Sequence, residues 1–170
     1  KDLPRKGKSS TRKYRRVRKR PRVGGAKSIL QRPVEAEDRQ ELGHWEMDCI
    51  ESGKAGGRAV LLNLTERCTR ESLLFKLPSQ RGEQVLSVLD GLERRMGAKC
   101  FRETFKSITV DNGSEFLDWK AMEKSVINYG RLSKRTSVYY CHPYHSWERG
   151  SNEQTNGVIR YFIPKGSDIS

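Results

Sequence analysis

Three strand-like segments follow one another in the first half of the sequence, and alternating helix-like and strand-like segments come after them. This order constrains the fold most strongly. Residues 44–51 alternate with a period of two, which is the pattern of a β-strand. The glycine-rich stretch 52–57 is typical of a hairpin turn. Two further strands are predicted at 58–65, which is rich in valine and leucine, and at 70–77. The sequence therefore predicts a meander of three antiparallel strands.

Helical and strand-like patterns alternate after this meander. The expected elements are, in order, a helix at 81–97, a strand at 105–111, a helix around 116–126, a strand at 137–141 and a helix from Ser151. Ser151 and Gln154 have the spacing of a capping box. This order predicts an α/β or α+β fold, with a mixed five-stranded sheet that has its three antiparallel strands first and is flanked by helices. We expect such a domain to continue beyond Ser170, because the chain stops soon after its last helix begins.

The positive charge of the sequence is concentrated in its first fifth. The net charge of the 170 residues is +13, and residues 1–34 hold 14 lysines and arginines against one acid, Asp2. Residues 1–39 show no strand or helix period, so we expect a basic, flexible arm there, regular structure from near Gly43, and a globular domain at 40–170. A basic arm on a neutral body favours nucleic acid as the partner, although an ordinary solvated tail is the alternative.

The four cysteines do not have the spacing of a zinc ribbon. They lie at positions 49, 68, 100 and 141, and no two form a Cys-x-x-Cys pair. Cys49 and Cys141 lie in apolar runs, and we expect them to be small core residues. This usage is typical of a reducing cytoplasm, and the sequence has neither a signal peptide nor an apolar run long enough to cross a membrane.

Three acidic residues stand in settings where a carboxylate needs a partner. Asp48 lies within the first strand, Asp111 closes a later strand before Asn-Gly, and Glu153 lies in the expected first turn of the last helix. Singly, each has an ordinary explanation: an exposed strand position, a turn signal, and a favourable interaction with the helix dipole. If they converge, the three carboxylates would bind hard divalent cations such as Mg²⁺ or Mn²⁺. In a basic protein, such a site is typical of metal-assisted phosphodiester chemistry.

The most specific pattern is a long polar and aromatic block around Glu153. Residues 139–160, together with 44–48 and 111–116, resemble transposases of the insertion sequence 30 family. Two further segments that resemble this family are 31–33 and 161–170. These transposases belong to the DDE group, so the resemblance implies a ribonuclease-H-like catalytic core similar to that of retroviral integrases.

The resemblance also implies the chemistry and its residues. Asp48, Asp111 and Glu153 would form the catalytic, metal-binding triad, which would hold Mg²⁺ or Mn²⁺ as two ions. The reaction would cut phosphodiester bonds at transposon ends and transfer the 3′-OH strand into target DNA. The partner would be DNA, on which a homo-oligomer assembles, in the bacterial cytoplasm at the nucleoid. Two features depart from the family: Met47, where glycine is common, and the 41 residues between Asp111 and Glu153, a long interval that a surface loop at 124–135 would absorb.

Weaker candidates for contacts with DNA lie near the triad and in the arm. Asn156 and Arg160 share a helical face behind the acid of the last helix, and Asn112 adjoins the second acid; a solvated face or a plain turn explains them equally well. The candidates in the arm are Arg12, Lys13, Arg15, Arg16, Arg18, Lys19 and Arg20. For His142 and His145 the sequence favours a packing or loop role over metal binding.

Two other functions compete with the transposase interpretation. A ribonuclease-H-like nuclease would use the same acids and metal to cut DNA but would not join a 3′-OH end to a target. A non-catalytic, basic nucleic-acid-binding module would leave the three separated acids unexplained. The family block around Glu153 favours the transposase.

Overall fold

A six-stranded mixed sheet organises the described part of the chain. The computed structural model describes residues 24–53, 58–127, 133–143 and 145–169. The strands lie in the order β1-β6-β5-β2-β3-β4. Their bounds are β1 Lys27–Ser28, β2 His44–Glu51, β3 Val60–Glu66, β4 Ser72–Leu77, β5 Ser107–Val110 and β6 Ser137–Tyr140. The α-helices are α1 Val34–Glu37, α2 Gly82–Met96, α3 Ala98–Thr104, α4 Trp119–Glu123 and α5 Gly150–Phe162, and the 3₁₀ turns are Ile29–Gln31, Ser114–Phe116 and Ser146–Arg149.

The predicted antiparallel meander and mixed sheet are confirmed. Strand β3 pairs antiparallel with both β2 and β4. Strand β5 pairs parallel with β2, and β6 pairs parallel with β5. Parallel neighbours need a crossover between them, and α4 lies in the connection from β5 to β6.

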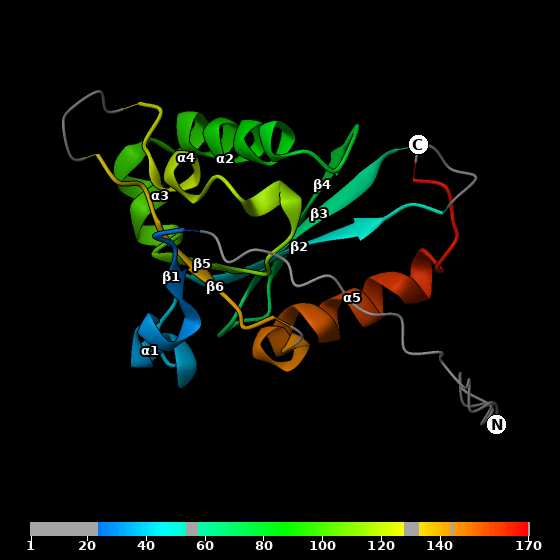
Figure 1. The fold of residues 1–170 in the computed structure, drawn as a ribbon, viewed down its shortest axis with the longest axis horizontal. Helices are drawn as coiled ribbons and strands as arrows, with labels where there is room; N and C mark the ends of the chain where they lie inside the picture. Colours follow the sequence, from blue (N-terminus) through cyan, green and yellow to red (C-terminus); the bar gives the residue numbers. More distant parts are fainter. Residues whose placement is uncertain (1–23, 54–57, 128–132, 144, 170) are drawn as a thin grey trace.

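The two faces of the sheet differ in polarity. On one face, Leu62 and Leu64 of β3 are fully buried in an apolar cluster that also contains Val85 of α2. Asn63, which lies between them in sequence, points the other way and donates from Nδ2 to Oδ1 of Asn156 in α5. Figure 1 shows α2 and α4 on one side of the sheet and α5 on the other. The apolar face therefore supplies the core, and the polar face lies under α5.

Regular structure begins earlier than predicted. Strand β1 pairs parallel with β6, with Lys27 opposite Tyr139 and Ser28 opposite Tyr140, so the sheet has a sixth strand and order does not start near Gly43. A two-residue strand carries no periodic signal, because its place is set by pairing with a distant strand. The division into an arm at 1–39 and a domain at 40–170 stays a prediction, and the basic cluster of the arm lies outside the described residues.

The helical segments also differ in detail from the prediction. The single helix expected around 116–126 is replaced by the 3₁₀ turn Ser114–Phe116 and the short helix α4, and the separate helix α3 was not predicted. Helix α5 begins at Gly150, and no side chain caps it locally, so the capping box predicted from Ser151 and Gln154 is wrong. The turn Ser146–Arg149 runs directly into α5, which places Ser151 inside the first helical turn instead of before it.

The prediction for the core cysteines agrees with their environment. Cys141 is buried and Cys49 is partly buried, and both are free thiols. Burial raises the pKa of the Cys49 thiol and raises that of Cys141 to about 12. Both therefore stay neutral at physiological pH. Within the described ranges, no helix combines the length and the apolar character that crossing a membrane requires.

Candidate active site

Asp48 and Asp111 lie side by side because their strands run parallel. In the ladder between β2 and β5, Glu46 pairs with Thr109. Asp48 and Asp111 each come two residues later, at the same edge of the sheet and with the same side-chain direction. The carboxyl ends of parallel strands are where ligands bind in open α/β sheets. The predicted adjacency of these two strands is confirmed.

One guanidinium faces both carboxylates. Arg149 Nη1 lies 3.0 Å from Asp48 Oδ1, and Arg149 Nη2 lies 3.5 Å from Asp111 Oδ2. Burial lowers the pKa of Arg149, but the charges of Asp48 and Asp111 outweigh that effect and leave its pKa above the ordinary value. Arg149 is therefore a permanent positive charge that offsets the repulsion between the two acids.

Asp48 is also held from the side of α5. Its Oδ2 accepts a hydrogen bond of 2.8 Å from Asn156 Nδ2. Asn156 Oδ1 in turn accepts from Asn63 Nδ2 of β3 at 2.9 Å. Because Asn63 is completely buried, this chain of amides fixes the rotamer of Asp48 through three elements of the fold.

Asp111 is held by the loop that follows it. Its Oδ1 accepts from the backbone N–H of Gly113 at 2.7 Å, as in an Asx turn. A Cβ atom at Gly113 would lie 2.8 Å from the same Oδ1, so a side chain there would push Asp111 out of place. The glycine of Asp-Asn-Gly is thus needed for close approach and not for its backbone conformation, since its φ of −64° is open to any residue.

Helix α5 is anchored to β2 by a buried acid. Glu46 has no exposed surface, and its Oε2 accepts from the backbone N–H of Asn152 at 2.8 Å. Its Oε1 forms an ion pair with Arg67, which is also buried and donates from Nε to the Ala36 carbonyl at 2.8 Å. Glu46 therefore satisfies a first-turn N–H of α5 and sets the helix against the sheet.

Glu153 is not drawn in with the two aspartates. It lies in the first turn of α5 and is exposed. Among the described residues, one group of at least three ligand-type side chains has its atoms within 4.8 Å of one another, and that group is not the predicted triad. The structure thus brings together Asp48 and Asp111, with Glu153 on the adjoining helix.

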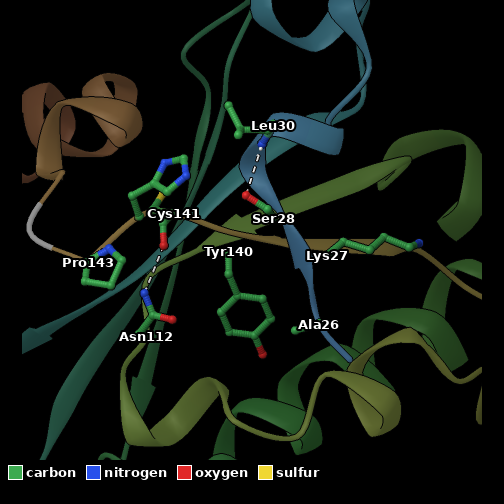
Figure 2. Close-up of a pocket in the computed structure, with 9 residues that line it drawn as sticks. Ala26, Lys27, Ser28, Leu30, Asn112, Tyr140, Cys141 and Pro143 are labelled. Atoms are coloured by element: carbon green, nitrogen blue, oxygen red, sulfur yellow. Dashed lines mark hydrogen bonds between the residues drawn. The ribbon is translucent and has the colours of Figure 1, made fainter. Parts of the chain in front are cut away.

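The candidates for DNA contact have internal partners. Asn156 orients Asp48, and Arg160 Nη2 donates to the Glu51 carbonyl at 2.9 Å. Asn112 Nδ2 donates to the Cys141 carbonyl at 2.9 Å, beside a pocket of about 330 Å³ between β1 and the end of β6 (Figure 2). These contacts support the shape of the site. The arm candidates Arg12, Lys13, Arg15, Arg16, Arg18, Lys19 and Arg20 lie outside the described residues.

The oxygens around Arg149 fit a divalent cation. Besides the two carboxylates, the Met47 carbonyl accepts from Arg149 Nη1 at 3.4 Å. Carboxylate and carbonyl oxygens are the donors that Mg²⁺ and Mn²⁺ prefer. The guanidinium is a stand-in cation at this point, and it marks where the oxygens of Asp48, Asp111 and Met47 converge on positive charge.

Sequence reasoning missed Arg149, Glu46 and Asn63. Arg149 precedes Glu153 by four residues, so their proximity could be foreseen, but nothing local shows that the guanidinium turns toward two strands. Glu46 alternates in phase with Asp48, which is a usable signal that both face α5. Asn63 also gave a usable signal of a polar contact, because an amide side chain is unusual within a strand of valine and leucine.

Comparison with known proteins gives consistent relatives. The model of the family described as integrase core domain matches residues 38–146. The chain is 35% identical over 169 residues to a probable transposase for insertion-like sequence element IS1161 from Streptococcus salivarius, covering 99% of this chain and 43% of that protein. It is 36% identical over 145 residues to the transposase for insertion sequence element IS1086 from Cupriavidus metallidurans. That match covers 84% of this chain and 38% of that protein.

A third relative connects the chain with the insertion sequence 30 group. Transposase InsI for insertion sequence element IS30C from Escherichia coli K12 is 33% identical over 137 residues, covering 81% of this chain and 32% of that protein. The chain spans less than half the length of these curated relatives.

A solved structure supports the ribonuclease-H-like fold. A chain in the cryoEM structure of the simian T-cell lymphotropic virus intasome in complex with PP2A regulatory subunit B56 gamma matches with a TM-score of 0.54 and 15% identity. The match covers 71% of this chain and 39% of that chain. It confirms the predicted fold class, with six strands instead of five.

Proposed function

This chain belongs to the integrase core domain family, within the insertion sequence 30 group of transposases, and from that premise we propose that it is the catalytic core of a DDE transposase. Its reaction is cleavage of phosphodiester bonds at transposon ends and transfer of the 3′-OH strand into target DNA. The observation that carries the proposal is the pair of carboxylates on neighbouring parallel strands, Asp48 within β2 and Asp111 directly after β5, which face one guanidinium.

The chain's own residues divide the work in this proposal. Asp48, Asp111 and Glu153 hold Mg²⁺ or Mn²⁺. When bound, the metal polarises the scissile phosphate and activates the attacking hydroxyl. Asn156 and the Gly113 N–H keep the two aspartates in position for this task. Since each is a fixed donor to one carboxylate oxygen, the other oxygen is left directed at the cation.

Arg149 competes with a metal for the same oxygens. We expect Arg149→Gln to lower the free energy of unfolding by about 1–2 kcal/mol without divalent ions, because two facing carboxylates lose their counter-charge. We expect Mg²⁺ to raise the melting temperature more in this variant than in the unmodified chain, since an ion that binds the folded state more tightly stabilises it more. Thermal unfolding with and without Mg²⁺ measures both effects.

Arg160→Gln is the matched control for this experiment. It removes the same charge from α5, the helix that directly follows Arg149, but Arg160 contacts the Glu51 carbonyl and neither aspartate. Its response to Mg²⁺ should equal that of the unmodified chain. An equal Mg²⁺ response in Arg149→Gln would show that the guanidinium does not compete with the ion.

The proposed partner is DNA, on which the transposase assembles as a homo-oligomer. Residues 1–23 contain 12 of the 14 lysines and arginines of the first 34 residues. We expect their deletion to weaken non-specific DNA binding and to flatten its salt dependence, because neutralising Z phosphates gives a slope of about −0.9Z for log affinity against log salt. Binding isotherms at several salt concentrations measure that slope.

The deletion should stop at residue 23. Lys27 and Ser28 form β1, so a longer deletion would remove a strand and confuse DNA affinity with stability. Unchanged affinity and slope after deletion of 1–23 would contradict the role of the arm.

A strand-transfer assay tests the proposed function. The full-length transposase is incubated with Mg²⁺, target DNA and oligonucleotides that carry the terminal sequences of the element that encodes it. The expected products are nicked ends and ends joined to target DNA. Nicking without joining would indicate the ribonuclease-H-like nuclease instead. Binding with no metal-dependent nicking would indicate the non-catalytic module.

A further inference from the structure

A second cluster of ligand-type side chains lies in the segment between β6 and α5. In the portion of the chain that the structure describes, His142, His145 and Glu148 are the one set of at least three such residues whose ligand atoms all lie within 4.8 Å of one another. Both imidazoles point Nδ1 at the same carboxylate oxygen: His142 Nδ1 lies 2.7 Å and His145 Nδ1 lies 3.3 Å from Glu148 Oε1. All three come from seven consecutive positions, so the cluster is local in sequence as well as in space.

Two of these side chains, those of Glu148 and His145, are also held by contacts outside the three ligand atoms. Glu148 Oε2 accepts from the backbone N–H of His142 at 2.8 Å, which fixes the plane of the carboxylate. The ring of His145 stacks on Trp147 with centroids 4.4 Å apart. Backbone bonds from His145 N to the His142 carbonyl and from Glu148 N to the His145 carbonyl close two successive turns. Such outside contacts are what orient the ligands of protein metal sites.

We propose that His142 Nδ1, His145 Nδ1 and Glu148 Oε1 bind one Zn²⁺-like transition-metal ion, separate from the oxygen site at Asp48 and Asp111. Two imidazoles and one carboxylate are a common donor set for zinc, whereas Mg²⁺ prefers oxygen alone. With metal–ligand bonds of about 2.0–2.1 Å, tetrahedral ligand atoms lie roughly 3.3 Å apart, so the pair at 2.7 Å has to open by about 0.6 Å.

The position of the cluster lets an ion enter from solvent and connect two segments of the backbone. The side chains of His142, His145 and Glu148 are 28%, 43% and 16% exposed, so the cluster is open to solvent on one side. Glu148 directly precedes Arg149, which faces the two aspartates. An ion there ties the end of β6 to the turn that begins α5, and so restrains the backbone that carries Arg149 and Glu153.

The alternative is that Glu148 simply accepts hydrogen bonds from both imidazoles. Metal titration separates the two. The tag-free 170-residue chain is titrated with Zn²⁺ by calorimetry, and with Co²⁺ by visible absorption, in excess Mg²⁺ so that the aspartate pair is occupied. We expect one ion per chain and a Co²⁺ spectrum without the sulfur-to-metal charge-transfer band. If that band appeared, it would show that cysteine sulfur binds the ion, most simply the exposed thiols of Cys68 and Cys100. That result would overturn the proposal.

Substitutions then locate the site. His145→Ala and Glu148→Gln should each weaken Zn²⁺ binding by at least the roughly 10–100-fold typical of losing an outer-shell partner. Zn²⁺ should raise the melting temperature of the unmodified chain and not that of Glu148→Gln. Glu83→Gln is the matched control, because it removes an exposed first-turn carboxylate from α2, outside both this cluster and the aspartate site, and should leave Zn²⁺ affinity unchanged.

His145→Asn guards against a folding artefact, since it keeps a polar side chain at a position that is 43% exposed. The melting temperatures of all variants without Zn²⁺ report whether they fold. Absence of saturable binding to the unmodified chain overturns the proposal, and so does undiminished affinity in the folded His145 and Glu148 variants.

Discussion

Asp48→Asn and Asp111→Asn should each reduce Mg²⁺-dependent DNA cleavage by at least about 10³-fold, because losing even one neutral hydrogen-bond donor to transition-state charge costs about 10²–10³. Each change keeps the shape of the side chain and removes the charge that a metal needs. DNA binding should persist, since the proposed contacts with DNA are basic residues elsewhere. Single-turnover cleavage of end-sequence oligonucleotides and a parallel binding assay measure the two properties.

Glu153→Gln tests a different part of the proposal. We expect the same loss of cleavage, although Glu153 is exposed and stands apart from the aspartate pair. The start of α5 is anchored because the Asn152 N–H donates to Glu46. The helix itself is therefore held in place, and the Glu153 side chain has to move to bring its carboxylate to the metal. Robust cleavage by this variant would remove Glu153 from the triad and leave the aspartates in place.

Glu51→Gln is the matched control for all three substitutions. Glu51 is an exposed acid at the end of β2, three residues after Asp48. Glu51→Gln removes one negative charge, as the other substitutions do, and it does so on the strand that carries Asp48. Cleavage by Glu51→Gln should equal that of the unmodified chain, and a comparable loss would mean that general charge near the sheet edge, and not metal ligation, sets the rate.

The strands were predictable where each one carries its own pattern. Strand β2 runs over His44–Glu51, the segment whose alternation predicted it. The neighbouring strands β3 and β4 begin two residues later than predicted, as is usual for element boundaries. Strand β1 could not be found in this way. Lys27 and Ser28 become a strand because β6 offers them an open edge, and that edge exists only in the folded chain.

The start of α5 shows the same limit at the site itself. Ser151 and Gln154 match a local capping pattern, yet the N–H of Asn152 is satisfied by Glu46, more than a hundred residues earlier in the sequence. A remote acid has replaced the local cap, which no window of neighbouring residues reveals. The two aspartates were predictable as candidates from their settings. Their grouping around Arg149 depends on strand register and helix placement together.

The anchor of α5 should be the most sensitive point for stability. Glu46→Ala leaves the buried guanidinium of Arg67 without its ion pair and the Asn152 N–H without its acceptor. Breaking a buried pair in this way typically costs about 3–5 kcal/mol. For a domain of this size, that loss lowers the melting temperature by about 6–20 °C. Thermal and chemical unfolding measure the change.

A second variant separates the unpaired charge from the lost packing. Glu46→Met combined with Arg67→Met should recover much of the stability that Glu46→Ala loses, since apolar side chains of similar volume avoid burying a lone charge. Glu37→Gln is the matched control: this acid also lies beside Arg67, at 3.7 Å, but is 66% exposed and should change stability by less than about 1 kcal/mol. If Glu46→Ala were as mild as Glu37→Gln, Glu46 would not be what holds α5 against the sheet.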